Sequence, residues 1–202
     1  SRTLRLDDGS FVRLAPESEL QVSLGGDQRM VRLEGRAFFA VAPDENRPFL
    51  VQVGGAQVRV LGTRFEVSEE DGKLRTVVVE GRVAMATTDG EVEIPAGSVG
   101  QASPGVPPVA EEVSDVLSLL DWPGGFLVFH DTPLRDVARE VARHFRTPIR
   151  IDPLANGNPR VSASFEGDES FEEGLETLCT VTAADGRISG VSAVIGSQDM
   201  EG

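Results

Sequence analysis

The stretch AQVRVLGTRFEVSEEDGKL, residues 56–74, decides how the first half of this chain folds. Before Gly62, the apolar residues Val58 and Val60 alternate with polar residues, which is the period of a strand with one buried face. The alternation changes phase at Gly62, so we interpret this glycine as a bend or bulge. Asp71-Gly72 can adopt the positive φ angles of a hairpin turn. The stretch therefore predicts two strands and a turn, not a ligand-binding loop.

The second of these strands also alternates, with Phe65 and Val67 predicted to point inward and Arg64 and Glu66 outward. Similar short runs, separated by turn dipeptides such as Asp8-Gly9 and Asp89-Gly90, recur about every 8–10 residues. Roughly ten to twelve strands of this kind predict an antiparallel sandwich or barrel over residues 1–103.

One run of the first half, residues 37–42, is apolar at every position. A strand with two apolar faces is buried on both sides. This run is therefore predicted to be a central strand.

The remaining residues follow a different pattern. Residues 104–120 begin with a Pro-rich segment and are predicted to be a linker. Residues 121–202 are predicted to form an α+β module of order β-α-β-β-α-β. Its strands are expected within 126–129, 149–151, 161–165 and 190–195.

Two helices are expected in this module. Thr132-Pro133 predicts an N-cap followed by Pro at the first helical position. The apolar face of this first helix is predicted to consist of Leu134, Val137, Ala138, Val141, Ala142 and Phe145. The run from Ser170 to Glu173 reads as a capping box, which predicts the start of the second helix.

Composition excludes several classes of function. The net charge of −14 argues against a nucleic-acid surface. His130, His144 and Cys179 are the only histidines and cysteine, and they lack metal-ligand spacing. The acidic run 166–173 is explained in part by a helix N-terminus. We therefore predict no metal, no cofactor, no catalytic residue and no enzymatic activity.

The chain contains no apolar run of 18 residues or more, so the sequence predicts no transmembrane segment. It also opens without an initiator Met. We interpret it as a piece excised from a longer protein, with any targeting segment upstream.

Several motifs, in the same order, make the first half resemble the periplasmic region of FecR-like proteins, which are membrane-anchored anti-sigma factors (sigma-factor regulators). The matching segments are residues 6–10, 32–42, 47–51, 60–67, 79–83 and 95–97. The second half is similar to the short N-terminal signalling domain of secretins and TonB-dependent transducers. That similarity lies in residues 121–122, 129–134, 161–165 and 170–173.

The resemblance implies a periplasmic, signal-receiving part of an inner-membrane protein. It implies binding to the signalling domain of a TonB-dependent outer-membrane transporter, and relay of iron-uptake signals to an extracytoplasmic-function sigma factor. The sigma factor would be bound by a cytoplasmic segment, and the membrane anchor would be an upstream helix, both absent from this chain.

Strand edges of the second half could accept a partner strand. We predict a partner-binding surface formed by Arg150, Arg160, Ser162 and Ser164. One alternative is an all-β module that binds carbohydrate or another small ligand in an aromatic-lined pocket, with the second half as an adaptor. Another is a hydrolase with two carboxylates of shifted pKa in a cleft.

Overall fold

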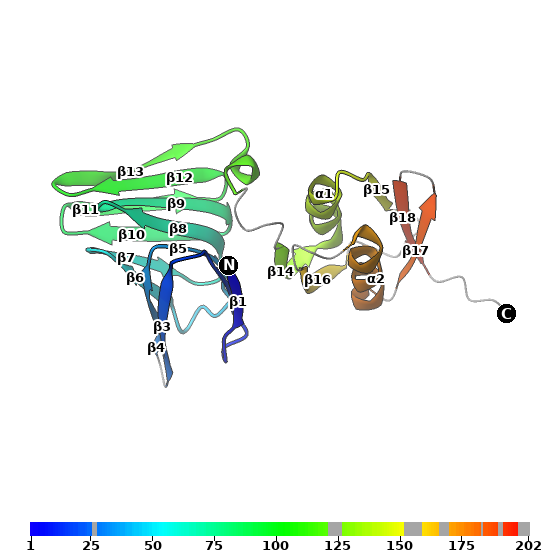
Figure 1. Cartoon of the computed structure of the whole chain (residues 1–202), viewed down its shortest axis with the longest axis horizontal. Helices are drawn as coiled ribbons and strands as arrows, with labels where there is room; N and C mark the ends of the chain where they lie inside the picture. The colour runs from blue at the N-terminus through cyan, green and yellow to red at the C-terminus, as the bar shows by residue number, and fades with distance from the viewer. Residues whose placement is uncertain are drawn as a thin grey trace. The chain divides into compact units, whose positions relative to one another are not determined.

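The computed structural model describes residues 1–25, 28–120, 127–151, 159–165, 170–182, 184–189 and 192–197. The chain forms two compact units, Ser1–Pro123 and Gly124–Gly202 (Figure 1).

The first unit is a sandwich of two open sheets. The seven-stranded sheet has the order β1 (Arg2–Arg5), β2 (Phe11–Leu14), β5 (Arg36–Ala40), β8 (Arg64–Glu70), β9 (Lys73–Glu80), β12 (Ser98–Ser103) and β13 (Val106–Glu112). The six-stranded sheet has the order β11 (Gly90–Pro95), β10 (Arg82–Thr87), β7 (Ala56–Val60), β6 (Phe49–Val53), β4 (Gln28–Glu34) and β3 (Glu19–Gly25). Neighbouring strands are antiparallel except β4 and β6, which are parallel. The predicted all-β fold is confirmed, as a sandwich.

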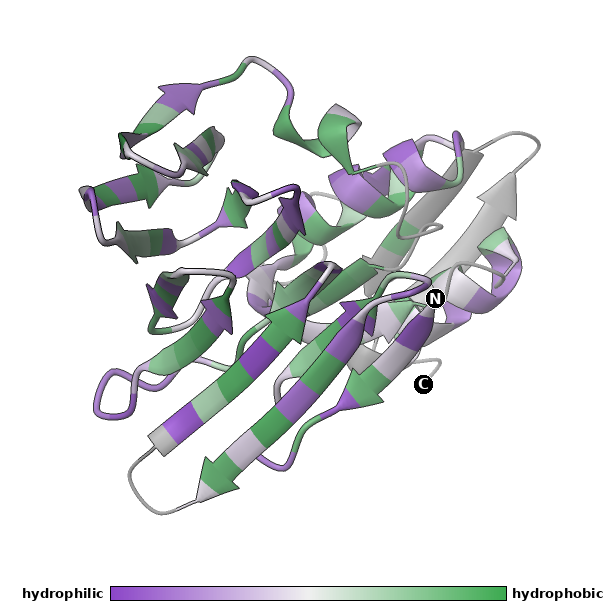
Figure 2. Ribbon diagram, turned by 60° about the vertical axis from the view of Figure 1, so that its left-hand side comes forward, coloured by the Kyte–Doolittle hydropathy of each residue, from purple (hydrophilic) through white to green (hydrophobic). Residues whose placement is uncertain are grey.

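The core lies between the two sheets. Phe39 stacks on Phe65 with ring centroids 5.3 Å apart, and it approaches Phe49 of the opposite sheet at 6.2 Å. Figure 2 shows apolar and hydrophilic residues alternating along many of the strands. Strand β5 lies between β2 and β8, and all residues from Ala37 to Val41 are buried. The predicted central strand is therefore confirmed.

The bend at Gly62 is also confirmed, because Gly62 connects β7 to β8. These two strands belong to different sheets, so the phase change marks the crossing from one layer of the sandwich to the other. A Cβ at Gly62 would lie only 2.7 Å from the Cα of Pro43, so glycine is needed for this close approach. The hairpin turn after β8 has φ angles of +51° at Asp71 and +75° at Gly72, as predicted.

The expected outward side chains of β8 do not face solvent. Arg64 and Glu66 lie opposite the core residues of β8, but both are buried. Glu66 Oε2 lies 2.9 Å from Nη2 of Arg36, and Oε1 lies 3.4 Å from Nη1 of Arg75. The prediction of a simple outward face was wrong because side chains of the neighbouring strands, among them Arg36, Arg75 and buried Val77, pack beside Glu66 on this face.

Residues 104–120, which were expected to be a linker, contain a strand and a 3₁₀ helix in the structure. Residues 106–112 form β13, which pairs with β12 at the edge of the seven-stranded sheet. Pro107 and Pro108 fit there because an edge strand needs N–H donors on one side only, and the register with β12 shifts beside them. The 3₁₀ helix η1 (Val116–Leu119) then packs against β9. The chain thus remains part of the sandwich through most of the expected linker.

The second unit has the predicted α+β fold. Strands β14 (Leu127–Pro133) and β16 (Arg160–Phe165) form an antiparallel pair. A second sheet has the order β15 (Ile149–Ile151), β18 (Ser192–Ser197) and β17 (Ala184–Ser189), with β15 parallel to β18. Strand β17 was not predicted, because its sequence begins Ala-Asp-Gly and is poor in strand-forming residues.

The two helices begin in different ways. In α1 (Leu134–His144), the predicted N-cap is wrong: Pro133 occupies the cap position, no side chain caps the helix, and Thr132 belongs to β14. The backbone N–H of Leu134 instead donates to the carbonyl oxygen of Pro159, 2.8 Å away. A neighbouring segment therefore satisfies the N–H group that a side-chain cap would have satisfied.

The capping box of α2 (Phe171–Thr182) is confirmed. Ser170 N–H donates to Glu173 Oε2 at 2.7 Å, and Glu173 N–H donates to Ser170 Oγ at 3.2 Å. The hydrogen bond that the Ser170 backbone N–H donates to the carboxylate, together with one from the Ser170 side chain, lowers the pKa of the Glu173 carboxyl below its usual value. The α-helices of the described residues have 11 and 12 residues, and none of them could cross a membrane.

Both helices bury their apolar faces against the strands. Leu134, Val137, Ala138 and Val141 are buried as predicted, and Phe145 packs at the end of α1. Phe129 and Phe165 meet edge to face at 5.9 Å between β14 and β16. Half-buried Cys179 packs on the same core, so its environment is that of a small core residue.

Candidate partner-binding surface

A bulge in β14 shapes the surface next to β16. The register runs from Phe129 opposite Ala163 to Thr132 opposite Val161, so two residues, His130 and Asp131, oppose the single residue Ser162. Asp131 has a φ of +47°, which is uncommon for a residue other than glycine and is tolerated best by Asn and Asp. The local backbone therefore presents Asp131 at the surface.

Two contacts hold the bulge against β16. The backbone N–H of Asp131 donates to Ser162 Oγ at 2.9 Å. Arg160 Nε donates to Asp131 Oδ2 at 2.7 Å. Both charged side chains are more than half exposed, so this pair contributes little to stability and remains open to a competing partner.

Strand β16 follows the predicted alternation. Val161 and Phe165 are buried, while Ser162 is exposed and Ser164 is half-buried. In the described part of the chain, β16 pairs with β14 only, so its second edge carries no strand. An edge of this kind can accept an added strand.

The four residues predicted to bind a partner divide between two sheets. Arg160, Ser162 and Ser164 lie together on β16, whereas exposed Arg150 lies on β15 and pairs in register with Val194 of β18. The structure thus assembles three of the four on one strand. The structure also places Asp131 on this surface. Sequence reasoning missed this residue, although the His-Asp-Thr-Pro run ahead of the first helix could have indicated it.

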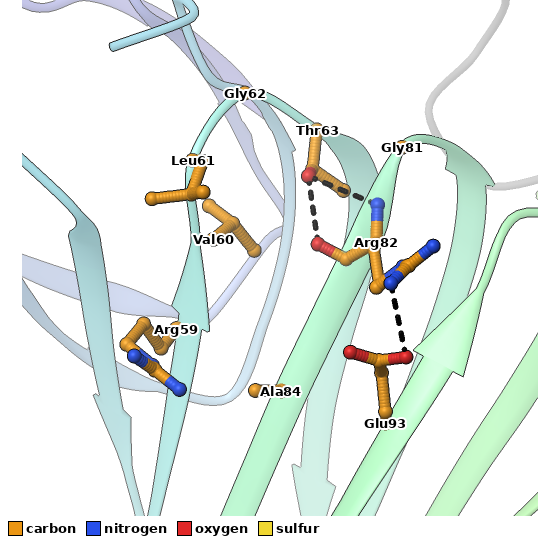
Figure 3. Close-up of a pocket in the computed structure, with 9 residues that line it drawn as sticks. All are labelled: Arg59, Val60, Leu61, Gly62, Thr63, Gly81, Arg82, Ala84 and Glu93. Carbon is orange, nitrogen blue, oxygen red and sulfur yellow. Dashed lines mark hydrogen bonds and ion pairs between the residues drawn. The ribbon is translucent and has the colours of Figure 1, made fainter. Parts of the chain in front are cut away.

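The first unit contains a surface pocket beside Gly62, with a volume of about 430 Å³ (Figure 3). Thr63 Oγ1 lies at its wall and donates to the carbonyl oxygen of Arg82 at 2.9 Å. Arg82 Nη1 in turn lies 3.2 Å from Glu93 Oε1. The lining is completed by Arg59, Val60, Leu61, Gly81 and Ala84.

The lining of this pocket has none of the aromatic side chains that a carbohydrate platform would supply. Two further pockets of this unit, of about 640 and 150 Å³, are also lined without aromatic residues. The phenylalanines Phe38, Phe39, Phe49 and Phe65 are buried in the sandwich. The aromatic pocket expected for a small-ligand module is therefore not found in these three places, while Trp122 lies outside the described residues.

The shifted titratable groups of the described residues have structural causes. Burial lowers the pKa of the His144 imidazole at the end of α1. The Arg47 guanidinium, 2.8 Å away, lowers the pKa of the exposed Asp44 carboxyl. Within the described ranges, no three His, Cys, Asp or Glu side chains form a group that could hold a metal ion. The acidic positions 166–169 lie outside the described residues.

Comparison with protein families identifies the chain. The profile of the FecR protein family matches residues 1–84, and the profile of the FecR C-terminal region matches residues 126–195. The two matches occur in order, one in each unit. The chain belongs to the FecR family. The resemblance to FecR-like proteins stated from the sequence motifs is thereby confirmed.

Solved structures of similar fold support the same architecture. A crystal structure of a candidate anti-sigma factor from Parabacteroides distasonis ATCC 8503 matches with a TM-score of 0.56 and 24% identity, over 98% of this chain and 95% of that one. A second structure carrying the same description gives the same score and identity, over 98% and 94%. This likeness shows the fold alone. No curated protein sequence matched the chain.

Proposed function

We propose that this FecR-family region is the periplasmic, signal-receiving part of an anti-sigma factor. In this proposal it binds the signalling domain of a TonB-dependent outer-membrane transporter and relays iron-uptake signals to an extracytoplasmic-function sigma factor. The region acts by protein–protein binding and performs no chemistry. Sigma-factor binding and membrane anchoring belong to segments of the full protein outside this chain.

The match of both FecR profiles, in order, carries this proposal. The geometry of the second unit supports it, because β16 has an edge without a strand partner in the described part of the chain. Exposed Arg160 lies at the start of β16, and its ion-pair partner Asp131 lies on the neighbouring strand β14, where the two could select a partner by charge. An added strand would obtain affinity from main-chain hydrogen bonds and specificity from these side chains.

The proposal is tested by titrating this chain, by isothermal calorimetry, with the signalling domain of a TonB-dependent transporter from the same organism. We expect one signalling domain to bind per chain. Arg160→Glu should weaken binding at least about tenfold, because a charge at the partner edge is reversed. Arg150→Glu should weaken it as well if β15 also takes part. The absence of binding at high micromolar concentration would contradict the relay.

Two further variants separate contact from structure. Asp131→Asn removes the ion pair with Arg160 but keeps a residue that tolerates a positive φ. If Arg160 contacts the partner directly, Asp131→Asn should leave most of the affinity intact while Arg160→Glu does not. Arg139→Glu reverses an exposed charge on α1 and should bind like the wild type. Equal losses in all the variants would count against a specific surface on β16.

A further inference from the structure

Strand β3 forms an outer edge of the six-stranded sheet, and no strand of the described residues pairs with its second side. Its seven residues, ELQVSLG, are each in register with β4, without a bulge. Five of the seven are exposed. Val22 at the centre is apolar and yet 46% exposed. In Figure 1 the β3–β4 hairpin extends from the body of the unit.

The other edges of the sandwich carry features that oppose strand addition. Strand β1 has only four residues and begins and ends with Arg. Strand β13 contains two prolines and a register shift. Strand β11 lies beside β13, where Gly105 N–H donates to Asp89 Oδ2 at 3.0 Å. Short length, proline, bulges and covering segments are the usual protections of an edge. Strand β3 has none of them.

The sequence of β3 is complementary to itself. If two copies pair antiparallel with Val22 opposite Val22, all seven residues find a partner. Leu20 then faces Leu24, and Gln21 faces Ser23. Glu19, the sole charge of the strand, faces Gly25 and is separated from the other Glu19 by the whole strand. This register therefore avoids opposing like charges, which destabilise a strand pair.

The two faces of the paired β3 strands are also complementary in polarity. Leu20 and Leu24 pack against the core of the sandwich, and Val22 lies on the same face because side chains alternate along a strand. Across the paired edges, the leucines and Val22 would form one continuous apolar row. Gln21 and Ser23 would form a polar row on the opposite face. Exposed Val22 would become covered at the centre of the interface.

We propose that β3 pairs with β3 of a second copy of this chain, antiparallel about a two-fold axis, so that two six-stranded sheets become one. The contact is isologous, since the same strand serves on both sides. Two paired edge strands bury less than a standard interface of roughly 1,600 Å², so the association is weak. This inference does not depend on the proposed function.

The association is measured by sedimentation equilibrium of the full chain at concentrations up to about 1 mM, the range in which weak contacts are populated. The average mass should rise from 21.6 kDa toward twice that value. Val22→Lys places two ammonium groups opposite each other and should keep the chain monomeric. Val106→Lys on β13, where Val106 is 54% exposed, changes a comparable apolar residue on another edge and should associate like the wild type.

A cross-linking experiment tests the register. In a Cys179→Ser background, Val22→Cys places two thiols opposite each other at the two-fold axis, whereas Val106→Cys does not. Mild oxidation should produce a covalent dimer at least about tenfold faster for Val22→Cys, because residues directly opposite have Cβ atoms about 4.5–5.5 Å apart. Circular dichroism shows that each variant is folded.

Three results would overturn the proposal. They are a monomeric wild type at about 1 mM, association of Val22→Lys equal to that of the wild type, and equal cross-linking rates for Val22→Cys and Val106→Cys. A monomeric wild type would exclude a second copy as the partner of β3, and would leave an extended segment of a different protein as the candidate partner. The second and third would place any contact between copies on another surface.

Discussion

Arg29 Nη1 lies 3.2 Å from Asp8 Oδ2, and this ion pair joins two segments that are 21 residues apart in the sequence. Both side chains are buried, with 2% and 6% of their surface exposed. The guanidinium also donates from Nε to the carbonyl oxygen of Arg47 and from Nη1 to that of Ala42, at 2.7 and 2.9 Å. It lies over the ring of Phe49. Arg29 therefore ties the β1–β2 turn to the loop that precedes β6.

Removing the carboxylate should destabilise the sandwich. We expect Asp8→Ala to lower the free energy of unfolding by about 3–5 kcal/mol, because the buried Arg29 charge loses its partner. Urea unfolding followed by circular dichroism measures the change. Glu91→Ala is the control, since it removes an acidic residue from an exposed ion pair with Arg59. Its effect should stay below about 1 kcal/mol. Similar losses in the two variants would contradict the structural role of the buried pair.

The crossing at Gly62 should not tolerate a side chain. Gly62→Ala would place a Cβ 2.7 Å from the Cα of Pro43 and 2.9 Å from its Cβ. We expect a loss of about 1–3 kcal/mol in unfolding free energy, as for other overpacked sites. Gly55→Ala in the turn between β6 and β7 is the matched control, because nothing lies within 4 Å of its Cβ position. Thermal unfolding of the two variants measures the difference, and equal midpoints would refute this account of Gly62.

The second unit should lose stability in mild acid through His144. Burial lowers the pKa of this imidazole below its usual value of about 6.5. The unfolded chain therefore binds the proton at a higher pH than the folded chain does. The contribution of His144 is complete above about pH 6.5 and is lost as the pH falls through the pKa of the folded state.

Urea unfolding at several pH values between about 5 and 8 measures this dependence. His144→Gln should flatten the part of the profile just below neutral pH, because Gln does not titrate. The ring contact of His144 with Phe145, at 4.5 Å, is lost in this variant at every pH. The test is therefore the slope of the unfolding free energy against pH, and not its absolute value. An unchanged slope would contradict the assignment to His144.

Much of the fold could be predicted because its signals are local. The alternation of Val58, Val60, Phe65 and Val67 identified two strands, and Asp71-Gly72 identified their turn. The Ser170–Glu173 capping box identified the start of α2 from four residues. Each of these features is decided by atoms within a few residues of one another, so short-range physics is sufficient to predict them.

The candidate surface was predictable only in part. Alternation along residues 160–165 correctly placed Ser162 on the exposed face. The part played by Asp131 depends on a bulge, which appears only when β14 and β16 are aligned with each other. The strand around Arg150 was predicted to face the partner together with the strand of residues 160–165, whereas hydrogen bonding places Arg150 on β15, in the other sheet.

The sequence by itself determined the two fold classes, the turns and the membership of the FecR family, since periodicity and motifs lie along the chain. Tertiary structure alone decided that β7 and β8 lie in different sheets and that residues 106–112 complete a sheet. It also decided that Glu66 is buried between Arg36 and Arg75. These outcomes depend on residues far apart in the sequence, and only pairing and packing bring them within a few ångströms.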